Sequence, residues 1–310
     1  MRNFFALAIA TAFSLSAFSA TLEDAQQAWS QRSWTPEGIS AAQRAADIYG
    51  ELATAAAGVD KGVLLTNQSE ATYFAGEAVA DVATKISFHE AGFTEAEQAQ
   101  GYLTYGDANW ARAKYFWGAN KGKWGLAKGP GSVIMEKPKL EQAMNEIMDA
   151  GQEAVEDFGP HRILGKLYGV LPGILGGDKV LAVYHLSYAL ENSRNELDEP
   201  THGLNVNYIG EIFPDIRDSK FDAGMDKAIS RARNMAETAA TDELKAKFSA
   251  AADRLEAARA NGALVYAKTS LEEFVTAASD TSREGALNPK RIAETVKELE
   301  DSKALLRKLQ

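Results

Sequence analysis

The feature that most constrains this chain is a pair of amphipathic segments in residues 159–190, separated by a turn rich in proline and glycine. The first segment repeats leucine and valine at helical spacing until one proline and three glycines, at positions 172–177, interrupt the pattern. Asp178 can cap a second helix, which carries a broad apolar stripe. Because the connection is short, the sequence predicts two antiparallel helices that pack against each other.

Small residues in this pair have a physical role. The L-G-x-x-Y motif of residues 164–168 is similar to the first helix of a tetratricopeptide repeat, and the A-x-x-x-L-x-x-A motif of residues 182–189 to the second. Gly165 and the alanines allow the helices to approach closely, whereas Tyr168 and Leu186 fill the space between neighbouring pairs. The connection is longer than in a standard repeat, so the pair is a variant of it.

These motifs together resemble the T-component family of TRAP transporters, which are periplasmic proteins with a tetratricopeptide-like fold. The residues that carry the resemblance are Gly159, Pro160, Arg162, Leu164, Gly165, Tyr168, Pro172, Gly177, Asp178, Ala182, Leu186 and Ala189. Residues 96–123 are similar to the aromatic-rich helix of that family, and the whole likeness covers residues 35–263. It implies a helical array around a central cavity, an apolar ligand site and association with a periplasmic solute-binding protein.

The periodicity of the whole chain predicts an all-α fold, in which helical hairpins resembling tetratricopeptide repeats stack into an α-solenoid, or superhelix, with extra C-terminal helices. Besides the pair in 159–190, helices are predicted for residues 35–57, 64–88, 94–117, 139–158, 201–212, 221–239, 244–266 and 269–278. The repeat domain takes in residues 20–287. Residues 288–310 form a C-terminal amphipathic capping helix, which starts at Asn288-Pro289. Its narrow apolar seam leaves self-association into a homo-oligomer as the alternative.

Residues 1–19 predict a secretory signal peptide, because a short basic region precedes an apolar run too short to span a bilayer. Ala17 and Ser19 fit the small-x-small rule for cleavage after Ser19, and a retained anchor is the alternative. The chain contains no cysteine, which excludes disulfides and a lipoprotein cysteine. The sequence therefore predicts a soluble periplasmic or secreted protein, although T-components typically carry a lipid on such a cysteine.

Charge and hydropathy limit the partners of the mature chain. A formal net charge of −10 repels phosphate backbones, so we expect no binding of nucleic acid. No apolar stretch after the signal is long enough to span a membrane. We expect a periplasmic solute-binding protein or another envelope protein as partner.

The sequence predicts neither a metal site nor a cofactor nor a catalytic centre. The four histidines lack the spacing of a helical zinc site, and no nucleophile motif occurs. The Gly- and Lys-rich residues 118–131 lack a nucleotide-loop pattern, so we expect a surface loop there. The connection 191–200 predicts a solvated acidic stretch. A hydrolase that uses this stretch with His202 is the enzymatic alternative to a non-enzymatic protein.

Aromatic residues concentrated in one predicted helix are the best candidates for a ligand site. Either they pack between repeats, as most aromatic stripes do, or some of them line an apolar cavity. The candidate ligand-binding residues are Tyr102, Tyr105, Trp110, Phe116, Trp117, Arg162 and Tyr168. Arg162 or Lys166 supplies a countercharge for an acidic ligand, unless Arg162 serves as a structural hydrogen-bond donor. The alternative function is a protein- or peptide-binding module without a small ligand.

Overall fold

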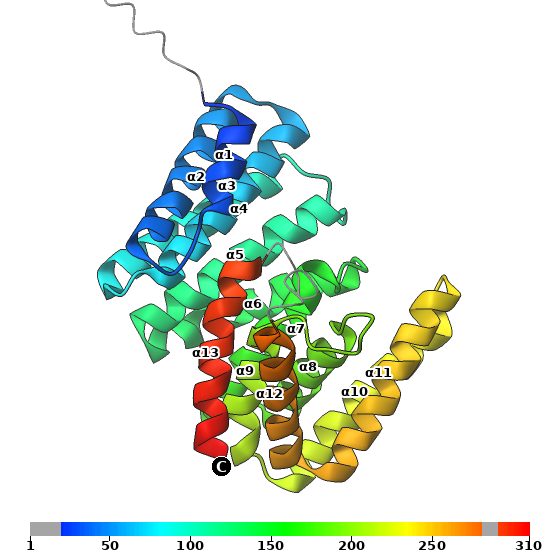
Figure 1. Ribbon diagram of the computed structural model, residues 1–310. Helices are drawn as coiled ribbons and strands as arrows, with labels where there is room; N and C mark the ends of the chain where they lie inside the picture. Colours follow the sequence, from blue (N-terminus) through cyan, green and yellow to red (C-terminus); the bar gives the residue numbers. More distant parts are fainter. Residues whose placement is uncertain (1–19, 281–290) are drawn as a thin grey trace, which may run out of the picture.

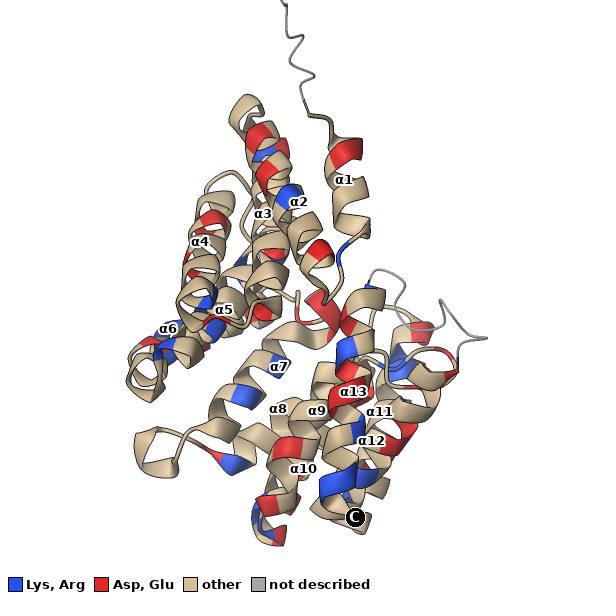
Figure 2. Ribbon diagram, turned by 60° about the vertical axis from the view of Figure 1, so that its left-hand side comes forward, with Lys and Arg blue, Asp and Glu red and all other residues tan. Residues whose placement is uncertain are grey.

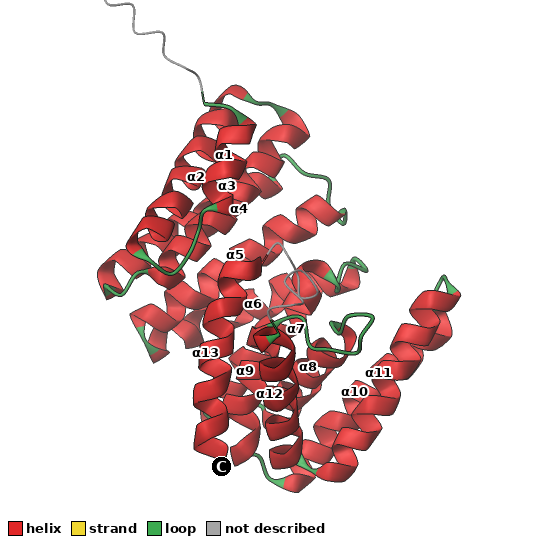
Figure 3. Cartoon of the chain, in the orientation of Figure 1, coloured by secondary structure: helices red, strands yellow, loops and turns green. Residues whose placement is uncertain are grey.

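The computed structural model describes residues 20–280 and 291–310, and within these ranges every regular element is a helix (Figures 1 and 3). The α-helices are α1 (Leu22–Ser30), α2 (Pro36–Ala55), α3 (Gly58–Ala78), α4 (Val82–Gln100), α5 (Ala108–Lys128), α6 (Pro130–Asp149), α7 (Val155–Val170), α8 (Lys179–Asn192), α9 (Gly203–Ile212), α10 (Asp218–Thr238), α11 (Asp242–Asn261), α12 (Ala263–Ser279) and α13 (Ile292–Leu309). Short 3-10 turns follow α7 and α9, at Gly173–Leu175 and Phe213–Asp215. The predicted all-α solenoid is confirmed.

Helices α1 to α6 form an N-terminal array in which each helix packs on the next one (Figure 1). Alanine dominates the buried face of α2, which lets α1 and α3 come close on either side. The predicted start of α2 is confirmed, because the Thr35 hydroxyl accepts a hydrogen bond from the Gly38 amide and Pro36 occupies the first turn.

The predicted central pair is confirmed as α7 and α8. The side chain of Asp178 accepts hydrogen bonds from the first amides of α8 and caps it. A Cβ atom at Gly165 would lie 2.5 Å from Cγ of Leu186, so only glycine permits this approach of the two helices. The pair joins the N-terminal array through contacts of α7 with α5 and α6.

The C-terminal half is built on α8. Helices α10 and α11 form a hairpin against α8, and α9, α12 and α13 form a second packed group. Phe213, Phe221 and Phe274 are completely buried in the core that joins them. Helix α13 lies along α9 and α12, and its first turn reaches the connection between α1 and α2 (Figure 1). The described part of the chain therefore closes into a ring.

Several predicted boundaries are wrong because glycines were interpreted as breaks. The gap predicted between the helices of residues 64–88 and 94–117 lies inside α4, where a Cβ atom at Gly92 would meet the Asn120 side chain at 2.5 Å. Both of these predicted helices are instead broken internally, at residues 79–81 and at residues 101–107. The predicted loop at 118–131 is helical except at Gly129, whose φ of 107° ends α5.

The next helix, predicted for residues 139–158, is α6; it begins earlier, at Pro130, and ends at Asp149, and α7 begins at Val155. The helix predicted for residues 244–266 is divided at Gly262 between α11 and α12. The acidic connection is also less solvated than predicted, because Glu191 is buried and pairs with Arg194 and Arg254. The start of the last helix at Asn288-Pro289 and the signal peptide of residues 1–19 lie outside the described residues. None of the helices in residues 20–280 and 291–310 combines the length and the apolarity needed to cross a bilayer.

Candidate functional site

A central cavity lies between the N-terminal array and the C-terminal half. Its walls come from α3 and α5 on one side and from α7, α9 and α13 on the other. Two adjacent compartments have empty volumes of about 660 and 1530 Å³, part of which is open to solvent, and we call them the apolar chamber and the polar chamber. Residues lining both chambers include Tyr73, Tyr115, Lys123, Arg162, Lys166 and Tyr208.

The apolar chamber is a pocket with a wall of aliphatic side chains. These are Leu126 from α5, Val133 and Leu140 from α6, and Ile163, Leu167 and Val170 from α7. Leu126 and Val170 are exposed to solvent. An apolar wall beside a small number of convergent charged and hydroxyl groups is the usual lining of a small-molecule site.

Basic side chains gather where the two chambers meet, on α5 and α7 (Figure 2). Lys123 pairs with Glu77 across the cavity wall, and Lys166 pairs with Glu211. Burial disfavours the charge of Lys123, but the Glu77 carboxylate outweighs this effect and raises the pKa of the lysine well above its usual value. Lys166 also lies 4.3 Å from the ring centroid of Tyr208. The Lys123 ammonium is therefore held charged beside the apolar chamber, and Lys166 lies next to it at the same junction.

Two tyrosines complete this junction. Burial raises the pKa of Tyr73 and of Tyr208, since the phenolate would lose its hydration. Their hydroxyls therefore stay protonated and can donate a hydrogen bond. Together with the lysines they offer donors of the kind that hold a carboxylate or a phosphate group.

Arg162 has a structural task in the cavity wall. It donates hydrogen bonds to the Tyr115 hydroxyl at 2.8 Å and to the Asn205 side chain at 3.2 Å, and also to the carbonyls of Glu156 and Asp157. These two residues have φ of 50° and 56°, in the left-handed region that residues other than glycine avoid. Arg162 thus fixes a strained turn at the start of α7.

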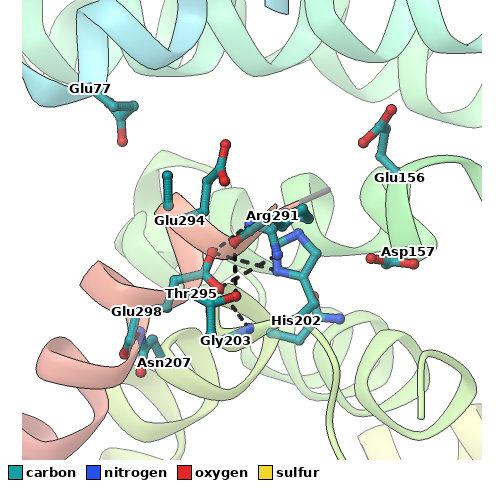
Figure 4. A network of polar contacts seen from close by, with 12 residues as sticks. Glu77, Glu156, Asp157, His202, Gly203, Asn207, Arg291, Glu294, Thr295 and Glu298 are labelled. Carbon is teal, nitrogen blue, oxygen red and sulfur yellow. Dashed lines mark hydrogen bonds and ion pairs between the residues drawn. The ribbon is translucent and has the colours of Figure 1, made fainter. Parts of the chain in front are cut away.

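A polar network anchors α13 at the floor of the polar chamber (Figure 4). The Glu298 carboxylate accepts hydrogen bonds from Arg291 at 2.6 Å and from the Gly203 amide at 3.0 Å. Nδ1 of His202 lies 3.9 Å from the same carboxylate. Burial, and then the charges of Arg162 and Arg291, lower the pKa of His202 well below its usual value. This histidine is therefore neutral. The carboxylate that it approaches belongs to Glu298 of α13, and not to the acidic connection of residues 191–200.

The structure brings two of the seven predicted ligand residues to the cavity, Phe116 and Arg162. The other five lie elsewhere: Tyr102 and Tyr105 are exposed, Trp110 packs against the Tyr105 ring, Trp117 borders a surface depression, and Tyr168 stacks on His185.

Sequence reasoning missed Tyr73, Lys123 and Tyr208. Tyr208 falls in the helix predicted for residues 201–212, but nothing in the sequence indicated that it faces the same space as Lys123. These residues come from different helices, and the fold alone brings them together.

Fold and site together define the class of this protein as an all-α helical-repeat protein that encloses a central cavity. Among the described residues, no group of three or more His, Cys, Asp or Glu side chains is arranged to hold a metal ion. Comparison with models of known protein families and with curated protein sequences finds no match to this chain.

Proposed function

We propose that this protein is a non-enzymatic periplasmic binding protein, and that its central cavity holds an amphipathic small molecule with an anionic head group. The observation that supports the proposal most is the aliphatic wall of the apolar chamber next to the basic junction of Lys123 and Lys166. An alkyl chain would fill the chamber, and a carboxylate would lie at the junction. In this view the ligand is held without covalent chemistry.

The resemblance to TRAP transporter T-components supplies the context of the proposal. A periplasmic solute-binding protein would then be the partner, and the cavity would hold a ligand in transit to an uptake system. The contacts of His202 agree with a non-enzymatic role, because the neighbouring Glu298 is already engaged by Arg291 and by a backbone amide.

Native mass spectrometry of the purified protein tests the proposal, with dodecanoate as the probe and dodecanol as its uncharged analogue. We expect one dodecanoate per chain and weaker binding of dodecanol. Lys166→Gln should weaken dodecanoate binding by about tenfold, since a charge-assisted hydrogen bond is worth about 1.5 kcal/mol or more. Lys303→Gln on the outer face of α13 is the control and should bind as the parent does. Equal binding of the two probes by every variant would contradict the anionic head group.

A second candidate function, the capture of a peptide, is favoured by a groove outside the cavity. This outer groove has an empty volume of about 2040 Å³ and runs between α1, α2 and α13. It offers the aromatic rings of Trp29 and Tyr49, the amide of Asn67, and the exposed Ile292 and Val296. Binding of an extended peptide with no binding of dodecanoate would move the function to this groove.

A further inference from the structure

Helix α13 is held firmly at its C-terminal half. Ser302 is completely buried and donates a hydrogen bond to the Asn207 side chain at 2.5 Å. The Asn207 amide in turn donates to the carbonyl of Glu298. Four leucines of α13 pack against the C-terminal core: Leu299, Leu305, Leu306 and Leu309. This half of the helix belongs to the C-terminal half of the molecule.

The N-terminal end of α13 contacts the other half of the molecule through polar groups. The Glu294 carboxylate accepts two hydrogen bonds from the Arg32 guanidinium, both at 3.1 Å. Next to it, the indole N–H of Trp34 donates to the carbonyl of Ala293 at 2.8 Å. The side chains of Ile292 and Val296 on this end are 58% and 59% exposed. Apolar packing at this end is limited to Ala293, which lies against the small cluster of Ala42, Phe74 and Ala75. Directional polar contacts supply the rest of the hold.

The receptor for Glu294 is built by the N-terminal array itself. The Arg32 guanidinium lies 3.9 Å above the Trp29 ring centroid and donates to the Trp29 carbonyl at 3.1 Å. A cation stacked in this way keeps its orientation whether or not a carboxylate is bound. The contact between Arg32 and Glu294 can accordingly break and form again while Arg32 keeps its place on Trp29.

The same contact stands between two cavities. Trp29, Trp34 and Arg291 line both the polar chamber and the outer groove, and so do Glu70 and Glu156. Glu294 lines the polar chamber, whereas Arg32 lines the outer groove. Separation of these two side chains would widen the region where the polar chamber and the outer groove adjoin. Figure 4 shows Glu294 and the polar network next to it.

We propose that α13 is a strap that pivots on its buried C-terminal half, and that the contacts of Glu294 with Arg32 and of Ala293 with Trp34 form its latch. Release of the latch widens the opening between the polar chamber and the outer groove and so speeds the entry and exit of ligands. This regulation of the site rests on the proposed function. Because only a few polar contacts form the latch, the free energy of the open state lies not far above that of the closed state. The open state would then be populated at roughly 0.1–10% and exchange with the closed state.

A thiol placed in the cavity tests the strap without any ligand. The chain has no cysteine, so Leu204→Cys, on the wall shared by both chambers, adds a single reactive group. We expect a soluble maleimide to modify it about tenfold faster after Glu294→Gln, and faster still when Trp34→Phe is added. Glu300→Gln removes an exposed carboxylate from the same helix and is the matched control. Equal rates for Glu294→Gln and Glu300→Gln would overturn the strap.

A second reporter separates local opening from unfolding. Ala228→Cys lies in the C-terminal core, and reagents reach it only when that core opens. Its reaction rate should be the same with and without Glu294→Gln, and an equal acceleration at both thiols would also overturn the strap.

Dodecanoate distinguishes the two proposals. The probe should slow modification of the thiol at position 204. If it has no effect while the latch variants still change the rate, the proposed ligand is wrong and the strap stands. If the probe protects the thiol but the latch variants react like the control, the ligand stands and the strap is wrong.

Discussion

Each half of the molecule buries a histidine that contacts a glutamate already paired with a cation. In the N-terminal array, Nε2 of His89 lies 3.3 Å from the Glu77 carboxylate, which also pairs with Lys123. The histidine is completely buried and packs against the Tyr73 ring. Lys123 and His89 hold the pKa of Glu77 well below its usual value, although burial acts in the opposite direction. We call this group the cavity triad.

The core triad in the C-terminal half repeats the arrangement. Nε2 of His161 lies 3.5 Å from the Glu153 carboxylate, which accepts a hydrogen bond from Arg231 at 2.7 Å and another from the Tyr188 hydroxyl at 3.0 Å. Burial opposes ionisation, but His161 and Arg231 outweigh it and lower the pKa of Glu153 to about 2. The carboxylate is therefore ionised and fully engaged.

The two triads differ in what surrounds the carboxylate. The Glu77 side chain is 20% exposed and lines the polar chamber, whereas the Glu153 side chain is 7% exposed and is enclosed by α7, α8 and α10. The same chemical groups are thus sealed into the core in one half and line a cavity in the other. The predictions below test this difference, from the largest effect to the smallest.

Removal of the carboxylate should cost most in the core. Glu153→Ala leaves Arg231, His161 and the Tyr188 hydroxyl without their common partner, so we expect a loss of about 3 kcal/mol in the free energy of unfolding. Glu77→Ala should lose about 1–2 kcal/mol, because water in the polar chamber can solvate Lys123. Unfolding in urea measures both values. A larger loss for Glu77→Ala would refute the distinction between an enclosed and an open triad.

Helix packing should show the same contrast. In Gly165→Ala the new methyl group meets Leu186 beside its backbone, which cannot move away, and we expect a loss of about 2 kcal/mol. In Gly118→Ala, on the helix that carries Lys123, the neighbour is the flexible end of Met144, so the loss should stay below about 1 kcal/mol. Thermal unfolding of both variants checks the order, and equal losses would contradict it.

The core triad also makes stability depend on pH. Burial lowers the pKa of His161. Burial and the charge of His161 together lower the pKa of His185 well below its usual value. The Nδ1 atoms of the two histidines lie 3.0 Å apart. The unfolded chain therefore binds more protons, so stability is complete above about pH 6.5 and falls as the pH drops. The slope should approach about 1.4 kcal/mol per pH unit for each histidine. In urea unfolding between pH 7 and 5, a double variant with glutamine at both positions should show a smaller slope, and buried His202, whose pKa is also lowered, should account for the remainder. An unchanged slope would assign the effect to other groups.

The smallest effect is expected for the Tyr188 hydroxyl, which donates a hydrogen bond to Glu153 of the core triad. Tyr188→Phe removes one hydrogen bond to Glu153 and keeps the ring in place, so we expect a loss of about 1 kcal/mol. In a double-mutant cycle with Glu153→Ala the two losses should not add, because both report the same contact. Additive losses would show that the hydroxyl acts independently of the carboxylate.

The central helix pair was the most predictable part of the fold. Its apolar spacing, the cap at Asp178 and the glycine at position 165 all act between neighbouring elements, so the local sequence contains them. Other glycines misled the prediction. Gly92 and Gly118 allow helices to cross closely, and only the packed partner, Asn120 or Met144, distinguishes this use from a turn.

The candidate site was far less predictable than the fold. The density of aromatic residues pointed to one helix, but Tyr102 and Tyr105 are exposed because they stand in the break before α5. The residues that meet at the cavity come from α3, α5, α7 and α9. Residues on different walls of the cavity lie far apart in the sequence. Such a site depends on how the solenoid curves, which local patterns do not encode.

The ring closed by α13 also sets an order of events for folding. Consecutive helices of the solenoid pack on their neighbours, so their association needs only short loops and can start at several places. The pairing of Arg32 with Glu294 instead joins positions 262 residues apart. Ring closure should therefore be the late and slow step, reached after both halves have formed, and a chain stopped before that step would hold nearly all of its helices around an open cleft.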